Sequence, residues 1–460
     1  MPRISLDASV WMRGASTSDY ISDGGFSPND KGMNLYATPG VLRQGASGAG
    51  AAAQFQSKGI IASTLTRSPV NPGAALVLSA DDVGAGYVYN LNSSAATGNT
   101  LRYGPDTARV YGTSFSDICF YKGKTYYTSD TDIAEDGDFD WWTTVRGHAA
   151  LDSTKRHNLF VFGDTLYITD GNVLHSWDGT TSTLAVLDLP SDMGITAAVS
   201  HKGYIYLAAT GWDDLSSALF GKGMIFIWDG VSASWISDFI VDELVKVLFS
   251  FEGILYASKS NSFGFFNGDA FVKIRTGGFG KHQITTNEGR ILIAQGNGIL
   301  AYGNPVPGRQ RFISFPWTAD STSSVSGIVS YFSQSVHASI GATAYLIQID
   351  TPSDATVRHF LFNKIPLGDY SFIRKFIVVM QSAVGVGDDV DLTYIDGSQR
   401  TVTVGTVNNT DHPGLREITF DLGDEPPTFI VQPRISINGG TNGVVRLFID
   451  YDYSESRTNK

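Results

Sequence analysis

The apolar and polar positions of the chain follow one phrase that returns five times between residues 117 and 317. Each copy contains a few apolar residues, a turn that carries Gly, and an apolar pair that usually ends in an aromatic residue. The copies occupy residues 120–127, 160–167, 199–206, 249–256 and, in a weaker form, 286–292. Their glycines are Gly123, Gly163, Gly203, Gly253 and Gly289, at spacings of 40, 40, 50 and 36 residues. Apolar runs around such a turn predict β-hairpins, because tight hairpin turns require positive φ angles.

A second phrase follows three of these glycines: Trp177-Asp178-Gly179, Trp228-Asp229-Gly230 and Phe266-Asn267-Gly268. It predicts a second hairpin in each period. Four short strands in about 40 residues are typical of a β-propeller blade. The sequence therefore predicts an all-β fold built on a degenerate β-propeller of roughly five to seven blades, with six favoured. A long β-sandwich with accidental Gly spacing is the alternative.

The regions on either side of the repeat predict two further parts. Residues 1–55 are turn-rich and include the small-residue stretch 44–53, so we expect an extended and partly flexible N-terminal arm. This arm has too little apolar surface to fold alone, and should lie against its own propeller or a neighbouring subunit. We expect the propeller at residues 56–317, with irregular first blades that lack a clear Gly phrase.

Residues 318–460 lose the period and predict a C-terminal β-sandwich-like domain. One hairpin is expected to pair residues 391–395 with 400–404 across Asp396-Gly397. Another is expected to pair residues 428–431 or 434–437 with 444–451. The best helical candidate in the chain is residues 240–249, which lead into a repeat copy and are also compatible with a strand.

The composition narrows the function classes. The chain has 460 residues, a net charge of −12, and no long run of Lys and Arg. This argues against a surface that grips nucleic-acid phosphates, which requires clustered cations. An acidic wall along which DNA slides without sticking remains compatible. The start of the chain lacks the apolar segment of a signal peptide, and no apolar run is long enough for a membrane span, so we expect a soluble protein made in the cytoplasm.

The single cysteine, Cys119, lies in the apolar run Ile118-Cys119-Phe120 and is expected to be a small buried hydrophobic residue. The eight histidines show no metal-ligand spacing. They are His148, His157, His175, His201, His282, His337, His359 and His412. No Gly-x-Ser-x-Gly elbow is present. Residues 48–53 match a loose dinucleotide fingerprint without a βαβ unit, and residues 279–282 lack the Ser or Thr of a phosphate loop, so neither predicts a cofactor site.

The dense group of carboxylates between residues 130 and 140 is the one candidate metal loop. It contains Asp130, Asp132, Glu135, Asp136, Asp138 and Asp140. Calcium takes six to eight oxygen ligands, but the EF-hand pattern fails because Ala134 and Thr143 stand at two ligand positions. A solvated hairpin tip is the favoured interpretation. No catalytic, cofactor-binding or metal residue is therefore predicted. A glycosidase pair of carboxylates from different blades stays open.

Four tryptophans could stack on sugar rings: Trp141, Trp142, Trp212 and Trp235. Aromatic residues also dominate blade cores and subunit contacts, which is the favoured interpretation.

The arrangement as a whole resembles the tail nozzle (tail hub) proteins of short-tailed bacteriophages, a family of virion β-propellers. The similar features are an extended start that contains residues 34–42, the degenerate propeller, and the terminal β-domain. The segment from Lys124 through the Ser129-Asp130 loop and Asp138-Phe139-Asp140 to Trp141 is also similar to the family.

The resemblance implies a non-enzymatic virion protein. It would form a homo-oligomeric ring, expected to be a hexamer, at the distal end of the tail channel. Its partners would be the tail adaptor and portal-proximal ring and other tail proteins such as fibres, spikes or a needle. DNA would pass through without specific binding, and no membrane insertion is expected. A receptor- or glycan-binding tail component is the first alternative, and a propeller glycosidase is the second.

Overall fold

The structure is a computed structural model of the chain. It describes residues 2–7, 33–34, 43–44, 48–54, 62–67, 72–80, 86–91, 100–103, 115–129, 133–136, 142–144, 151–152, 155, 157–211, 222–287, 289–303, 311–318, 324–331, 335–340, 343–348, 358–362, 364–423, 425–439 and 442–453. Over these residues the fold is all-β, and a single 3₁₀ turn interrupts the strands. No described helix is long and apolar enough to cross a membrane.

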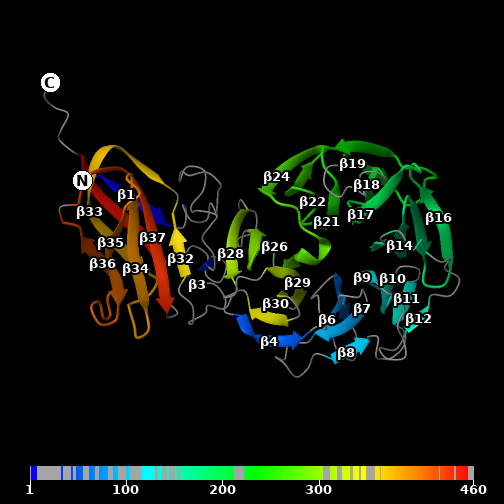
Figure 1. The fold of residues 1–460 in the computed structure, drawn as a ribbon, viewed down its shortest axis with the longest axis horizontal. Coiled ribbons are helices and arrows are strands. Elements are labelled where there is room, and N and C mark those ends of the chain that lie inside the picture. The colour runs from blue at the N-terminus through cyan, green and yellow to red at the C-terminus, as the bar shows by residue number, and fades with distance from the viewer. Residues whose placement is uncertain are drawn as a thin grey trace.

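Seven four-stranded antiparallel sheets within the described residues are the blades of a β-propeller (Figure 1). Blade 1 contains β5 (Ala62–Arg67), β6 (Pro72–Ala80), β7 (Gly86–Leu91) and β8 (Thr100–Tyr103). Blade 2 contains β9 (Phe115–Tyr121), β10 (Lys124–Ser129), β11 (Ile133–Asp136) and β12 (Trp142–Thr144). Blade 3 contains β13 (Leu159–Phe162), β14 (Thr165–Asp170), β15 (Val173–Trp177) and β16 (Ser182–Asp188).

The other blades follow the same order. Blade 4 contains β17 (Met193–His201), β18 (Tyr204–Gly211), β19 (Gly223–Trp228) and β20 (Ser237–Val241). Blade 5 contains β21 (Val245–Phe251), β22 (Ile254–Lys259), β23 (Ser262–Asn267) and β24 (Ala270–Thr276). Blade 6 contains β25 (Ile284–Asn287), β26 (Arg290–Gln295), β27 (Gly298–Gly303) and β28 (Phe312–Thr318). Blade 7 contains β29 (Val325–Tyr331), β30 (Ser335–Ile340), β31 (Thr343–Gln348) and, from the N-terminal region, β4 (Gly48–Gln54).

The propeller is closed by β4, which pairs with β31 as the fourth strand of blade 7. The first strands of the blades lie around the centre, and β29 of blade 7 lies beside β5 of blade 1. This corrects two expectations. The blade number is seven instead of the favoured six, and the expected boundary at residue 317 falls at the end of blade 6, before blade 7. The small-residue stretch at 48–53 is a paired strand, because an edge strand is held by its backbone and requires no large side chains.

The turns of the first hairpins explain the recurring glycines. Lys122 and Gly123 have φ angles of 45° and 80°, and the equivalent Lys202-Gly203 and Glu252-Gly253 turns are also positive at both positions. Such turns match the right-handed twist of the two strands that they join. Gly163 occupies the first turn position in blade 3, with a φ of 57°. The predicted hairpins at these four glycines are therefore confirmed.

The same tyrosine position locks four pairs of neighbouring blades. It is the third residue of the second strand, and it is occupied by Tyr126, Tyr167, Tyr206 and Tyr256. In three pairs the ring meets the aromatic residue near the end of the third strand of the next blade, and in the fourth the ring packs against the cluster that contains this residue. The indole nitrogen of Trp177 donates to the Tyr126 hydroxyl at 3.2 Å, and Tyr167 meets Trp228 edge-on at 6.0 Å. Tyr206 and Phe266 share one core cluster, and the Tyr256 and Tyr302 centroids are 6.4 Å apart.

The C-terminal domain is built from two layers that share one long strand, β33 (Ile365–Met380). One layer contains β1 (Arg3–Asp7), β38 (Val444–Tyr453), the later part of β33 and β36 (Glu417–Asp421). The other contains β32 (Arg358–Leu361), β37 (Thr428–Gly439), β34 (Asp389–Asp396) and β35 (Thr401–Asn408). The Phe376 and Tyr394 rings stack at 5.6 Å between β33 and β34.

The expected hairpin across Asp396-Gly397 is confirmed, since Ile395 pairs with Thr401. The second expected hairpin is wrong, because β37 and β38 both pair with β33 and not with each other. The strand β37 ends at Gly439, and β38 begins at Val444 in the other layer. A Gly-rich sequence between two strands is compatible with a hairpin and with such a change of layer. The best helical candidate, residues 240–249, follows the strand alternative, because these residues end β20 and form most of β21.

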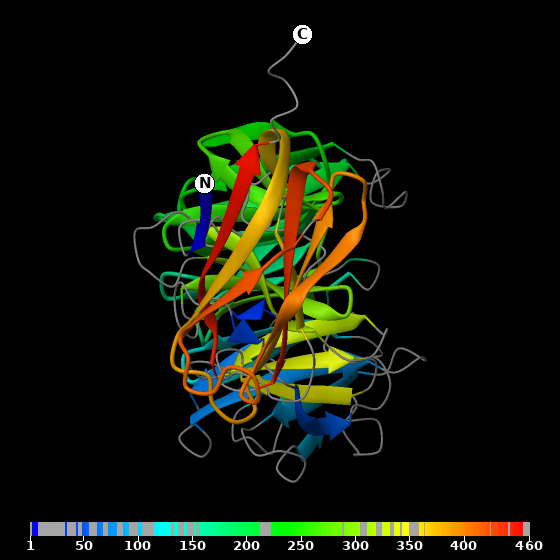
Figure 2. The same cartoon turned by 90° about the vertical axis from the view of Figure 1, so that its left-hand side faces the viewer.

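Both ends of the described N-terminal region belong to folded sheets. The strand β1 pairs with β38 of the C-terminal domain, while β4 completes the propeller. The short strands β2 (Met33–Asn34) and β3 (Arg43–Gln44) lie near β28, β32 and β37, between the two parts (Figures 1 and 2). Buried apolar residues of blades 6 and 7 and of the C-terminal domain form one continuous core cluster. The chain therefore ties its C-terminal domain to the propeller.

Replacing Tyr167 with Ala should lower the free energy of unfolding by about 3–5 kcal/mol, because a buried aromatic ring between two blades is lost. Tyr204, at 43 % exposure on the next blade, is the matched control. Its replacement by Ala should change stability by less than about 0.5 kcal/mol. Denaturant unfolding measures both, and equal losses would contradict the locking role of Tyr167.

The docking of β1 should weaken in acid. Arg3 donates to both Asp450 oxygens at 2.6 and 2.7 Å, and this pairing lowers the pKa of Asp450. A carboxylate whose pKa is lowered in the folded state contributes stability at pH values above the usual pKa of Asp. This contribution is lost as the pH falls through the lowered pKa. The difference in melting temperature between wild type and Asp450→Asn should therefore be greatest near neutral pH and vanish at low pH. A difference independent of pH would contradict this.

Candidate functional site

The centre of the propeller is occupied by a short segment of the chain itself. The 3₁₀ turn η1 (Lys281–Gln283) lies between β24 and β25 and contacts β5, β26 and β29. Gly278 allows the preceding loop to approach blade 5 closely, since a Cβ there would lie 2.2 Å from the Ser260 carbonyl oxygen. The Phe279 amide donates to Ser258 Oγ at 2.6 Å, and the Gly280 amide donates to Gln283 Oε1 at 2.8 Å. These contacts fix η1 in place.

An ion pair crosses this centre. Lys281 Nζ donates to Asp117 Oδ2 at 2.5 Å, which joins η1 to β9 of blade 2. The Asp117 carboxylate is buried and also accepts the amides of Ile118 at 2.9 Å and of Leu159, in blade 3, at 2.8 Å. One carboxylate thus holds three separate parts of the ring. Because its oxygens are already used by these donors, the arrangement is suited to holding structure.

A pocket of about 260 Å³ lies beside η1, between β21 and β25. Its lining residues are Val247, Leu248, Phe249, Ser250, Lys281, Ile284, Thr285 and Thr286. The volume is below the roughly 300–1,000 Å³ typical of ligand sites. No carboxylate of the described residues lines this pocket, so these residues do not supply the pair that a glycosidase requires. Ser250 Oγ lies 2.8 Å from His201 Nδ1. Burial lowers the pKa of His201, which favours the neutral imidazole.

A second polar group, in blade 3, brings two histidines to one carboxylate. His157 Nδ1 and His175 Nε2 lie 3.8 and 3.6 Å from the two Asp170 oxygens. Burial acts to raise the pKa of Asp170, but hydrogen bonds from His175 and from the Asp152 amide outweigh it and lower the pKa. Among the described residues, no group of three or more His, Cys, Asp or Glu side chains is arranged to hold a metal ion.

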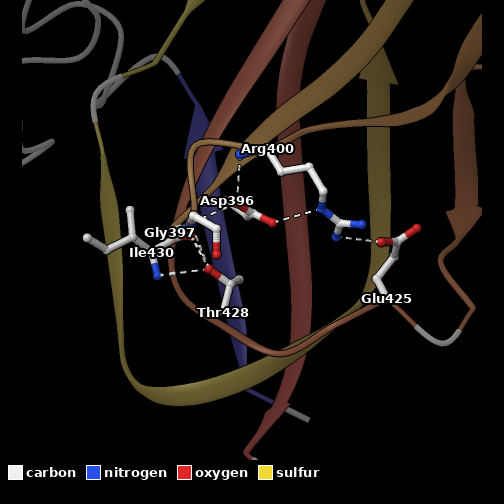
Figure 3. Close-up of polar contacts among 7 residues, drawn as sticks. Asp396, Gly397, Arg400, Glu425, Thr428 and Ile430 are labelled. Carbon is white, nitrogen blue, oxygen red and sulfur yellow. Dashed lines mark hydrogen bonds and ion pairs between the residues drawn. The ribbon is translucent and has the colours of Figure 1, made fainter.

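A third polar group closes the β34–β35 turn of the C-terminal domain (Figure 3). Asp396 accepts the amides of Ser398 and Arg400 and the Arg400 guanidinium, and Arg400 also donates to Glu425 at 2.8 Å. Burial would raise the pKa of Asp396, but the hydrogen bonds from Arg400 and Ser398 prevail and lower it. The Gly397 amide donates to Thr428 Oγ1 at 2.9 Å. These groups satisfy one another and brace the turn.

The predicted acidic loop is not a single loop. The strand β11 runs through it, with Ile133 buried at 2 % exposure and Glu135 and Asp136 within the strand. Asp130, Asp132, Asp138 and Asp140 lie outside the described residues, as do the side chains of Glu135 and Asp136. The interpretation as a solvated hairpin tip therefore stays a prediction.

The four candidate tryptophans differ in how much of each residue the structure describes. Trp235 packs edge-on against Phe226 at 5.1 Å, and its indole nitrogen donates to Asp238 at 2.9 Å, so it belongs to the blade 4 core. Trp141 and Trp212 lie outside the described residues, and Trp142 is described only as part of the β12 backbone. Their expected roles stay predictions.

Cys119 is partly buried in β9, and burial together with the nearby Asp117 charge raises the pKa of its thiol to about 12. A thiol with so high a pKa stays protonated at neutral pH and is a poor nucleophile. This agrees with the expectation of a small apolar residue at this position.

Sequence reasoning did not find the Asp117–Lys281 pair or the Asp170 group. One signal for the first was present, since Asp117 is the only charged residue in the strand Phe115–Tyr121. No sequence pattern matches Asp117 to Lys281, which lies 164 positions away. Such a pairing depends on the circular order of the blades.

A scan of protein-family models finds no match to the chain, and a search of curated proteins finds none either. Solved structures with a similar chain course include YCF48, determined with a bound peptide, at 10 % identity and a TM-score of 0.43, covering 66 % of this chain and 95 % of YCF48. PorZ, a type IX secretion component of Porphyromonas gingivalis, has 11 % identity and a TM-score of 0.44, covering 82 % of this chain and 48 % of PorZ. An exo-beta-1,3-galactanase of Phanerochaete chrysosporium has 10 % identity and a TM-score of 0.35, covering 88 % and 100 %. These likenesses are weak and say nothing of activity.

Replacing Lys281 with Met should lower the free energy of unfolding by about 3 kcal/mol, because it leaves a buried carboxylate without its cation. Asp117→Asn should cost less, since the Lys281 side chain is 44 % exposed and stays solvated. The double variant should be more stable than Lys281→Met alone. Chemical unfolding of the three variants tests this order. A double variant whose loss equals the sum of the two single losses would contradict the pairing.

Proposed function

We propose that the chain is a non-enzymatic structural subunit that assembles with copies of itself into a ring, as its resemblance to phage tail nozzle proteins implies. The observation that carries the proposal is the occupied centre of the propeller. Propellers commonly use the central channel to hold a ligand, and here η1 contacts the inner strands β5 and β29 while Lys281 pairs with Asp117 of the inner strand β9. A centre crossed by the chain's own ion pair favours a rigid block over a catalytic pocket.

The way the two parts are joined also supports a structural role. The strand β1 belongs to the C-terminal domain, the strand β4 belongs to the propeller, and the two parts share a continuous apolar core. A subunit of a ring has to transmit force between neighbours without bending at an internal linker. Two chain crossings and a common core provide that stiffness.

In this proposal the ring is part of a virion tail and encloses the path of the ejected DNA. The net charge of −12 supports this use, because a predominantly acidic protein repels phosphate and lets DNA pass without specific binding. The other partners would be the tail adaptor and further tail proteins.

Purified protein examined by light scattering and negative-stain imaging, alone and with its neighbouring virion proteins, should give closed rings with a central hole. The scattering mass then fixes the subunit number. A monomer in both samples that adheres to cells or to glycans would contradict the proposal and favour the receptor-binding alternative.

The protein should also release no reducing sugar from a panel of polysaccharides, since the described central pocket offers no carboxylate pair. Sugar release that persists after purification to constant specific activity would contradict a non-enzymatic role. Loss of that release on replacing a pair of carboxylates would then identify the active site.

A further inference from the structure

The ring of inner strands has one gap, between blades 5 and 6. The first strands of every other pair of neighbouring blades approach each other closely. Among the described residues, β21 and β25 make no comparable approach. The pocket beside η1 lies in this gap and is lined by residues 247–250 of β21 and residues 284–286 of β25. The central wall of the propeller therefore offers room to a ligand at this place.

Hydrogen bonds hold the two strands on opposite sides of the gap. On β21, Ser250 Oγ lies 2.8 Å from His201 Nδ1 of blade 4. On β25, Thr285 Oγ1 accepts the Ser330 amide of blade 7 at 3.1 Å. Each strand is thus fastened to the blade on its far side. The gap is formed before any ligand binds, which lowers the entropic cost of binding.

The strand edges that border the gap carry main-chain groups without a ladder partner. In the described sheets, β21 pairs with β22 alone and β25 pairs with β26 alone, each across a two-residue turn. The residues that flank such a turn form a hydrogen-bonded pair, and the ladder bonds then recur at every second residue. The amides and carbonyls of Leu248, Ser250 and Thr286 fall at the intervening positions. They therefore point away from the partner strand, toward the pocket that these residues line.

The walls of the pocket are apolar. Val247 and Leu248 are each 5 % exposed, and Phe249 and Ile284 pack against the core cluster that contains Tyr256. The volume of about 260 Å³ exceeds the roughly 150 Å³ of an engineered apolar cavity that holds benzene. One aliphatic side chain with its flanking peptide groups suits a pocket of this size.

The side chains that line the pocket favour a neutral ligand. Lys281 is the charged residue among them, and its Nζ pairs with the buried Asp117 carboxylate at 2.5 Å. The hydroxyls of Ser250 and Thr285 already engage blades 4 and 7. An ion would therefore gain little here, whereas a neutral ligand with donors and acceptors meets the free main-chain groups.

Alternating amides and carbonyls at the spacing of a strand are what an extended peptide presents. Such a peptide forms main-chain hydrogen bonds with an unpaired strand edge, and its side chains enter pockets beside that edge. We propose that the gap between β21 and β25 binds an extended, uncharged peptide segment of a partner protein, with one aliphatic side chain in the pocket. This inference goes beyond the proposed ring and does not depend on it.

The probe is acetyl-Ala-Leu-Ala-amide, which is neutral and carries one aliphatic side chain between peptide groups. Its binding to the full chain, followed by saturation-transfer NMR, should be saturable. The control peptide has methyl groups on the nitrogens of its leucine and of the alanine that follows. It keeps the apolar side chain and lacks two N–H donors, so it should bind about ten-fold more weakly or worse.

Three variants locate the site. Thr286→Trp places a large ring in the pocket and should lower the affinity for the probe by about ten-fold or more. Thr286→Val removes only the hydroxyl and should leave the affinity unchanged. The matched control is Thr276→Trp, because Thr276 is exposed at the end of β24, outside the pocket. An unchanged melting temperature verifies that each variant folds.

Hydrogen exchange of the wild type locates the probe without any replacement. Saturating acetyl-Ala-Leu-Ala-amide should slow amide exchange in residues 245–251 and 284–287. It should leave exchange in β16 of blade 3 unchanged.

Binding that is weakened by methylation and by Thr286→Trp, with slower exchange in both strands, supports the proposal. Absence of binding up to the solubility limit of the probe overturns it, as does equal affinity for the methylated peptide. Slower exchange confined to other strands, or binding that persists in a folded Thr286→Trp variant, places the probe elsewhere and also overturns it. Loss of binding in Thr286→Val would assign recognition to the hydroxyl and overturn the main-chain contact.

Discussion

The fold depends on one recurring contact, in which a tyrosine on the second strand of a blade packs against an aromatic residue on the third strand of the next blade. A four-stranded blade cannot bury both of its faces alone, so its stability depends on its neighbours. Tyr126 with Trp177, Tyr167 with Trp228, and Tyr256 with Tyr302 supply that contact. Tyr206 packs against the core cluster that contains Phe266, so the series runs across five consecutive blades. Because each contact requires the next blade, the ring gains its full stability only when it closes. The strand β4 meets that requirement.

A second contact fastens the centre of the propeller. The loop before blade 6 turns inward through Gly277 and Gly278, and Lys281 reaches across to Asp117. Together with the other hydrogen bonds of Asp117, this ion pair links η1, blade 2 and blade 3. The C-terminal domain is also joined to the rest of the chain, through the pairing of β1 and through a core cluster that it shares with the propeller. A chain that uses its N-terminal region twice to fasten itself is suited to being a building block.

The repeating pattern was enough to predict the all-β propeller, because Gly123, Gly203 and Gly253 occupy turns that demand positive φ angles. It could not predict blade 7, since that blade combines residues 325–348 with β4 and has no Gly phrase. The layer change after β37 escaped prediction because the glycines at 439, 440 and 443 are equally compatible with a hairpin. Asp117 and Lys281 could not be paired from the sequence, since their contact depends on the circular order of the blades.

The central claim is that the chain forms one closed rigid body, and hydrogen exchange followed by mass spectrometry tests it most directly. The account predicts that amides of residues 48–54 are protected to the same degree as those of β31, and that peptides from β1 exchange together with those from β38. Fast exchange across residues 48–54, with β31 still protected, would contradict closure of the propeller by β4. Fast exchange of β1 alone would contradict the fastening of the C-terminal domain by the N-terminal strand.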